Sequence, residues 1–256
     1  MVIGEALTAL LRRDKAIVLA ALAVAVAFAW TYLLLGAGVE MKTMDMGGGA
    51  MMAMPPEWSL GYAAAVFVMW VVMMMAMMLP SAAPVVLLAA ALDRQRNVAV
   101  RSNALFVSGY LVIWVGFSLM ATIVQWALDK AGLLSDTMAA SNRLLAAGVL
   151  VAAGLYQWMP LKQACLTHCH SPAEFLVRRW REARFVIGMR HGLFCLGCCW
   201  MLMALLFVGG LMNLAWIAVI AVLVLIEKTL PWGGRTSRLT GIALIGWGAA
   251  ALTMAR

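Results

Sequence analysis

Apolar residues fill long runs along the chain, and polar residues gather in short segments between the runs. A transmembrane helix needs about 20 predominantly apolar residues. By this criterion the pattern predicts seven membrane spans, of which the fourth and the sixth are short: 17–35, 60–79, 104–126, 144–159, 191–212, 214–226 and 239–255. Every Asp, Glu, Lys and Arg lies outside these windows, because an unpaired charge in hydrocarbon costs several kcal/mol. The expected fold is a single all-α membrane domain over residues 1–256, a bundle of about seven helices.

Basic residues alternate from one connecting segment to the next. Most of the 19 Lys and Arg residues lie in four segments that would face the same side: 1–16, 80–103, 160–190 and 227–238. The positive-inside rule assigns these segments to the cytoplasm. We therefore expect the N-terminus inside, the C-terminus outside and a basic cytoplasmic loop at 160–190. The first span is expected to stay as an uncleaved anchor, because its apolar run is longer than the ~7–15 residues of a signal peptide.

Composition supports a membrane location. Apolar residues make up 65% of the chain and charged residues 12%, whereas soluble domains have about 45–50% and roughly 25%. This excludes an ordinary soluble enzyme, a disordered chain and a nucleic-acid-binding domain. The net charge of +8 is assigned to loops that meet the anionic inner leaflet of a bilayer. We expect a multi-pass protein of the bacterial inner membrane with no nucleic-acid partner.

Sulfur-bearing residues are unusually frequent, with 21 Met and five Cys against three His. The outer loop 36–59 is rich in Met, interrupted by Gly and closed by two prolines, so it should be flexible rather than helical. Thioether sulfur is a soft ligand that suits Cu(I), and it forms no disulfides in an oxidising compartment. We predict metal capture by the six Met residues of this loop, the alternative being an interfacial loop of Met-biased composition: Met41, Met44, Met46, Met51, Met52 and Met54.

A second group of Met residues lies in the second span. Residues four apart stack on a helix, so Met69, Met73 and Met77 form a stripe with Met74 and Met78 beside it. This stripe could pass a soft cation along the bundle interior. Plain packing is the alternative, since Met is a flexible apolar filler.

All five Cys residues lie on the expected cytoplasmic side, where structural disulfides are uncommon. Helical spacing places Cys165, His168 and Cys169 on one face, and His191 and Cys195 on another together with Cys198 or Cys199. We predict that the two faces form one metal site. Two or three thiolates suit Cu(I), and a larger thiolate set suits Zn(II) or an iron–sulfur cluster; the spacing alone does not choose. The alternative is that the thiols are buried small apolar side chains.

Four polar residues are expected beside this site, where they could orient its ligands or carry a proton: Gln157, Lys162, Glu227 and Lys228. The Glu–Lys pair could equally be an interfacial anchor at a helix end. His170 is expected in a loop rather than as a ligand. Hydrolase, kinase and proton-pump motifs are missing from the sequence.

Three motifs together resemble a bacterial family of predicted metal-binding integral membrane proteins, a domain of unknown function. They are MWVVMMMAMMLP at 69–80, PLKQACLTHCHSP at 160–172 and HGLFCLGCCWMLM at 191–203, followed by FVGGLMNLAW and a Glu–Lys pair. The resemblance begins near residue 60 and runs to the C-terminus. It implies a metal site on Met69 to Met78, Cys165, Cys169, Cys198 and Cys199. His170 departs from the family pattern, in which an Arg is expected at this position.

The preferred function is a membrane protein that binds a soft metal ion, most readily Cu(I), and relays it across the inner membrane or to a partner such as a metallochaperone. Movement must follow a gradient because the sequence has no ATPase motif, and tighter binding by inner thiolates than by outer thioethers favours import. A non-enzymatic role is favoured. Two alternatives stay open: a membrane thiol oxidoreductase that uses Cys195 and Cys198, and an assembly subunit of a larger membrane complex stapled by a metal ion.

Overall fold

The computed structural model describes residues 2–37, 42–45, 51–54, 57–95, 101–135, 137–179 and 181–253. Helices make up almost all of this part of the chain, in the order α1 (Val2–Leu34), α2 (Leu60–Gln95), α3 (Arg101–Lys130), α4 (Arg143–Tyr156), α5 (Pro160–His170), α6 (Pro172–Arg178), α7 (Arg184–Ala204), α8 (Leu206–Gly209), α9 (Leu214–Thr229) and α10 (Gly233–Thr253). Two short strands, β1 (Lys42–Asp45) and β2 (Met51–Met54), pair as a hairpin. The expected all-α class is confirmed, with this hairpin added.

The prediction of seven membrane spans is wrong. Within the described ranges, four segments are long and apolar enough to cross a bilayer: Ala16–Leu34, Leu60–Arg94, Ser102–Lys130 and Arg184–Gly209. A fifth span results if α4 and α5, which meet at an angle of 62°, are counted together. The window at 214–226 lies in α9, which has only 16 residues. The window at 239–255 lies in α10, whose first turns carry Arg235 and Arg238 and lower its hydropathy.

The bend between α4 and α5 follows from the local sequence. Met159 has extended backbone angles, φ −66° and ψ 139°, as expected for a residue that precedes a proline. Pro160 then opens α5 at a position where its missing N–H is not needed. The segment 160–170, expected to belong to a loop, is therefore a helix.

Close helix contacts depend on glycine. A Cβ on Gly109 of α3 would stand 2.1 Å from the carbonyl oxygen of Phe185, and one on Gly188 of α7 would stand 2.0 Å from that of Phe106. Gly154 of α4 and Gly241 of α10 allow the same close approach. A Cβ added to either glycine would stand 2.9 Å from the carbonyl oxygen of the other. Small residues at such crossings are typical of membrane helices, because packing rather than apolar burial holds the helices together.

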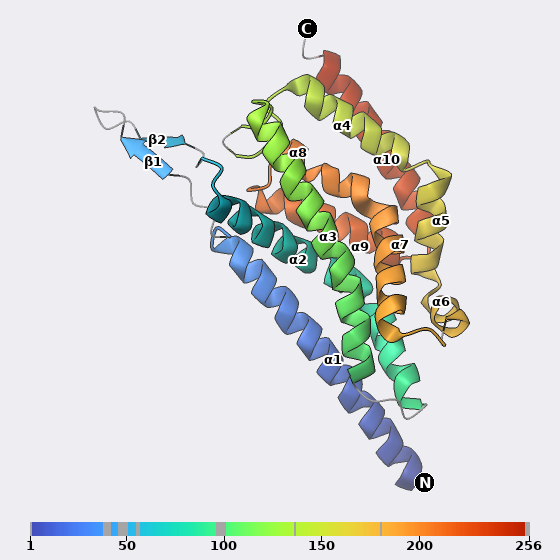
Figure 1. Cartoon of the computed structure of the whole chain (residues 1–256). Coiled ribbons are helices and arrows are strands. Elements are labelled where there is room, and N and C mark those ends of the chain that lie inside the picture. Colours follow the sequence, from blue (N-terminus) through green and yellow to red (C-terminus); the bar gives the residue numbers. More distant parts are fainter. Residues whose placement is uncertain are drawn as a thin grey trace.

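Figure 1 shows the arrangement of the helices. The start of α1 and the end of α10 lie at opposite ends of the bundle. The end of α2 and the starts of α3 and α7 lie toward the end where α1 begins, and the hairpin β1–β2 projects at the start of α2. Helix α1 packs on α2, α3 packs on α2 and α7, and α4 pairs with α10 (Figure 1).

Candidate metal centre

Three sulfur atoms converge between α2 and α7. Cys195 and Cys199 are four residues apart on α7 and therefore share one face of the helix. The Cys199 Sγ lies 4.0 Å from the Sδ of Met78, the last member of the Met stripe on α2. All three side chains are at most 2% exposed. We call Met78, Cys195 and Cys199 the three-sulfur centre.

Lys228, near the end of α9, reaches into this centre. Its Nζ lies 2.8 Å from Cys195 Sγ, 3.4 Å from Cys199 Sγ and 3.6 Å from Met78 Sδ. The side chain is only 5% exposed. The Glu–Lys pair is therefore no interfacial anchor, because its lysine contacts the sulfur atoms directly.

Tyr110 of α3 joins the two helices that carry the sulfur atoms. Its hydroxyl lies 3.2 Å from the Met78 carbonyl oxygen, to which it donates, and 3.1 Å from the Cys195 Sγ. The side chain is 1% exposed. The sequence analysis did not select Tyr110 as a site residue. The signal that could have identified it is a polar hydroxyl in the middle of an apolar span.

The remaining thiols lie next to the three-sulfur centre. Helix α5, which carries Cys165 and Cys169, packs on α7, which carries Cys198. Cys165 packs against Gly197, where an added Cβ would stand 2.7 Å from its Sγ. All five cysteines are free thiols. Cys169 is half-buried and the other four are buried.

The Met stripe faces the bundle interior. The stripe residues on α2 are at most 1% exposed: Met69, Met73, Met74, Met77 and Met78. Trp70, between the first two, donates to Gln125, which in turn donates to the Sδ of Met138 over 3.2 Å. Met138 lies in the connection between α3 and α4 and is buried; its place in an irregular connection hid it from a search based on helical spacing.

The other polar residues predicted here form a buried network behind Lys228. Lys162 of α5 is fully buried and forms a 2.6 Å ion pair with Glu227. It also donates to the side-chain oxygen of Gln157, which accepts a second hydrogen bond from Ser237 at 2.9 Å. Burial raises the pKa of the Glu227 carboxyl, and the Lys162 ammonium opposes the rise. The Lys162 and Glu227 charges compensate one another, which leaves Lys228 to face the sulfur atoms.

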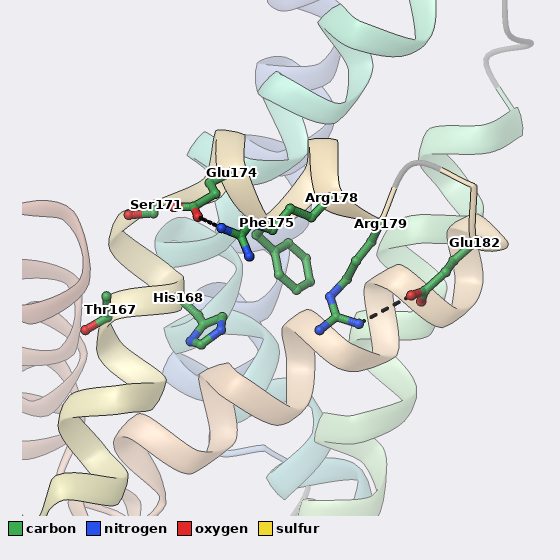
Figure 2. A pocket seen from close by; sticks show the side chains of 8 residues that line it. All are labelled: Thr167, His168, Ser171, Glu174, Phe175, Arg178, Arg179 and Glu182. Carbon is green, nitrogen blue, oxygen red and sulfur yellow. Dashed lines mark hydrogen bonds and ion pairs between the residues drawn. The ribbon is translucent and has the colours of Figure 1, made fainter.

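The three histidines have different surroundings. His191 is buried among the rings of Phe106, Tyr110 and Phe175. His168 is exposed and stacks on Phe194, with ring centroids 4.1 Å apart. Figure 2 shows it in a polar pocket that α5 shares with Glu174, Arg178 and other residues of α6 and its flanks, none of them a cysteine. His168 is thus not brought to the thiols.

His170 was expected in a loop, but it lies in a helix and contacts α9. It is the last residue of α5, and its Nε2 lies 2.7 Å from the backbone oxygen of Glu227. This contact ties α5 to the end of α9, the helix that carries Lys228.

A cavity of about 490 Å³ lies between α2, α5 and the end of α9. Its walls include Ser81 of α2, Cys169 and His170 of α5, and Lys228. Lys228 thus touches both the cavity and the sulfur atoms. An ion or a partner's side chain in this cavity would meet Cys169 and Lys228.

The donor set suits a soft monovalent ion. Three sulfur ligands about 2.3 Å from one ion and in one plane would stand about 4 Å apart, and the Cys199–Met78 separation of 4.0 Å meets this spacing. Thioether sulfur is a ligand for Cu(I). Among the described residues, no group of three or more His, Cys, Asp and Glu side chains has the arrangement of a metal site. Zn(II) and iron–sulfur clusters, which need such groups, fit less well.

In the described part of the Met-rich segment, residues 42–45 and 51–54 form the hairpin rather than a helix, as expected. Met44 pairs with Met52 across the two strands, Asp45 with Met51, and Lys42 with Met54. Met41 and Met46 lie outside the described residues. The hairpin projects beside the first turn of α2 (Figure 1).

A comparison with known protein families gives a match over most of the chain. Residues 67–251 match the model of the family PpoB2, which is described as a copper chaperone. The matched segment begins just before Met69 and contains every residue of the three-sulfur centre, Lys228 and all five cysteines. No curated protein and no solved structure matches the chain.

Proposed function

The chain belongs to the PpoB2 family of copper chaperones, and from this premise we propose that it binds Cu(I) between its membrane helices and passes the ion on. The observation that carries this proposal is the convergence of Met78, Cys195 and Cys199 in the bundle interior. Two thiolates and one thioether make a ligand set that Cu(I) prefers over harder ions.

The proposed route begins at the Met-rich hairpin and follows the buried stripe of α2. Met69, Met73 and Met77 are spaced by one helical turn, and Met78 at the end of the stripe belongs to the three-sulfur centre. Thioethers bind Cu(I) less tightly than thiolates do, so the ion gains affinity as it approaches Cys195 and Cys199. No ATP-binding motif is needed for movement in this direction.

The proposed exit is the cavity beside α5. Cys169 lines the cavity, and its helix α5 packs on α7, which carries Cys198. An ion can therefore pass between neighbouring thiols toward a partner that docks there, such as a soluble metallochaperone or a membrane complex. Cys165 lies on the same helix, one turn before Cys169, and is a reserve ligand on this path.

We place the protein in the bacterial inner membrane, with α1 starting in the cytoplasm. Four or five helices have the length and hydropathy to span a membrane. The basic residues gather in the segments around the ends of α2 and α5 and the start of α7, which favours the cytoplasm for that end of the bundle. The hairpin would then lie outside, where copper is collected.

The two other functions considered from the sequence receive less support. A thiol oxidoreductase needs a cysteine that a partner's disulfide can reach, whereas Cys195 and Cys198 are at most 2% exposed. An assembly subunit stapled by a metal ion would have no need for a buried Met stripe that leads from a Met-rich hairpin to the thiols.

Copper binding by the full-length protein in detergent under anaerobic conditions tests the proposal. We expect one tightly bound Cu(I) with only sulfur neighbours at about 2.3 Å in X-ray absorption. Cys195→Ser and Cys199→Ser should abolish tight binding, and Met78→Leu should weaken it by about tenfold or more in competition with a Cu(I) chelator. Met75→Leu is the matched control, since Met75 is on α2 but only half-buried and outside the stripe. A wild-type protein without tight Cu(I), or variants that all bind like the wild type, would refute the centre.

A further inference from the structure

Among the residues that the structure describes, Lys228 is the charged side chain that contacts the three-sulfur centre. Its ammonium faces Cys195 Sγ at 2.8 Å, Cys199 Sγ at 3.4 Å and Met78 Sδ at 3.6 Å. A charge buried this deeply is unfavourable unless an opposite charge or a set of acceptors compensates it. The sulfur atoms supply that compensation.

The neighbouring ionisable groups do not remove this charge. Glu227 is paired with Lys162 at 2.6 Å. Tyr110 contacts the centre through its hydroxyl, 3.1 Å from the Cys195 Sγ, and His191 stacks on the Tyr110 ring. The Cys198 and Cys199 thiols both donate to the Cys195 carbonyl oxygen, at 3.0 and 2.9 Å, but of the two only the Cys199 Sγ also lies near the Lys228 Nζ, at 3.4 Å. Two thiols, one thioether and one ammonium therefore define the charge of the centre.

We infer that Lys228 makes the three-sulfur centre selective for a monovalent ion, by balancing the charge of the bound complex. This inference rests on the proposed function and adds the residue that determines specificity. When a monovalent ion binds, both thiols lose their protons to solvent, the ion forms bonds to the two thiolates and the thioether, and Lys228 keeps its protons. The complex of one monovalent ion with two thiolates carries one negative charge, and the Lys228 ammonium brings the sum to zero.

A divalent ion gives a different sum at the same ligands. Zn(II) with two thiolates is neutral, so Lys228 adds an uncompensated positive charge in a water-poor interior. Such a charge is strongly unfavourable, because Coulomb interactions are weakly screened away from water. Lys228 therefore favours Cu(I) or Ag(I) and opposes Zn(II), independently of the softness of the sulfur ligands.

The cavity explains how this selection acts on incoming or outgoing ions. Lys228 lines both the centre and the cavity of about 490 Å³ that also contains Cys169. Because Lys228 lines the cavity, its positive charge acts on a cation there. The electrostatic repulsion on a divalent ion is twice that on a monovalent one.

The experiment compares metal preferences of purified full-length protein in detergent. Dissociation constants for Ag(I), Cu(I) and Zn(II) are measured for the wild type and for Lys228→Met, which keeps the length of the side chain but removes its charge. We expect the preference for Ag(I) over Zn(II) to fall by at least about tenfold in Lys228→Met. Lys228→Arg, which keeps the charge, should retain the preference, and Arg235→Met, which removes an exposed positive charge on α10, should not change it.

A compensated pair of variants tests the same charge balance with one thiolate removed. Cys199→Ser leaves one thiolate with the ion and the ammonium, a sum of one positive charge, and the double variant Lys228→Met/Cys199→Ser returns the sum to zero. We expect the double variant to bind Ag(I) more tightly than Cys199→Ser does. An unchanged preference in Lys228→Met, or a double variant no better than Cys199→Ser, would overturn the inference. A wild type that binds neither Cu(I) nor Ag(I) at these residues would instead refute the proposed function.

Discussion

Met78 and Cys199 hold their sulfur atoms 4.0 Å apart although 121 residues separate them in the chain. Neither α2 nor α7 therefore carries the centre alone. Tyr110 on α3 fixes their relation, because its hydroxyl contacts the Met78 carbonyl oxygen and the Cys195 Sγ. Packing of three helices thus sets the geometry of the sulfur ligands.

The Met stripe gives the first prediction. Met69, Met73 and Met77 changed together to Leu should leave the fold intact, since such swaps in a core usually cost less than ~1.5 kcal/mol each. The same variant should lose transfer of Cu(I) from the outside to the thiols, because Leu has no lone pair for the ion. Copper uptake into proteoliposomes measures this, with Met75→Leu as control. Wild-type flux in the triple variant would show that the stripe only packs, and would favour the assembly subunit.

The outer segment gives the second prediction. Replacing its six Met residues by Leu, at 41, 44, 46, 51, 52 and 54, should preserve folding because the hairpin projects from the helices (Figure 1). Cellular copper accumulation at low external copper should fall, since the collecting thioethers are lost. At high external copper the variant should approach the wild type. Equal accumulation at equal expression under both conditions would remove the segment from the route.

The contact between α3 and α7 gives the third prediction. Gly109→Ala would place a methyl group 2.1 Å from the Phe185 carbonyl oxygen, and the helices must separate to accept it. We expect a loss of stability of about 1–3 kcal/mol or more and weaker Cu(I) binding, because α7 carries two of the ligands. Gly116→Ala, on the same helix with nothing within 4 Å of the added Cβ, should behave like the wild type. Thermal unfolding in detergent makes the comparison; equal melting temperatures would contradict this account of the crossing.

The buried ion pair gives the fourth prediction. Lys162→Met leaves Glu227 buried without its partner, which should cost about 3–5 kcal/mol of stability. Lys162→Met combined with Glu227→Gln removes both charges and should recover most of this loss. Lys130→Met, at an exposed position, serves as the reference for loss of a lysine. Denaturant unfolding that shows no recovery in the double variant would mean that Lys162 acts through packing rather than charge.

The sequence predicted the apolar helices and the sulfur residues well. Runs of apolar residues at 17–35, 60–79 and 104–126 correspond to α1, α2 and α3, because long apolar segments have few stable alternatives to a helix. The four-residue spacing of Met69, Met73 and Met77 placed them on one face, and that face is buried. Helical periodicity alone is sufficient for such an inference.

The number of spans and the role of Lys228 could not be predicted in this way. A hydropathy window does not distinguish a span from a shorter helix such as α9 that packs inside the bundle, since both are apolar. Lys228 follows the apolar run of α9 and was therefore expected at a boundary, whereas the packing of α9 on α2 carries it to Met78 and Cys195. Such a position depends on tertiary contacts that a single sequence does not encode in its spacing.

The graded depth of the thiols has a consequence for the lifetime of the protein in oxidising conditions. Oxidation of a thiol by peroxide depends on access to its sulfur. Cys169 is half-buried in the cavity wall, whereas Cys195, Cys198 and Cys199 are at most 2% exposed. Cys169 should react first and act as a sacrificial guard, so that the ligands behind it remain reduced and able to hold an ion that is itself stable only in its reduced state.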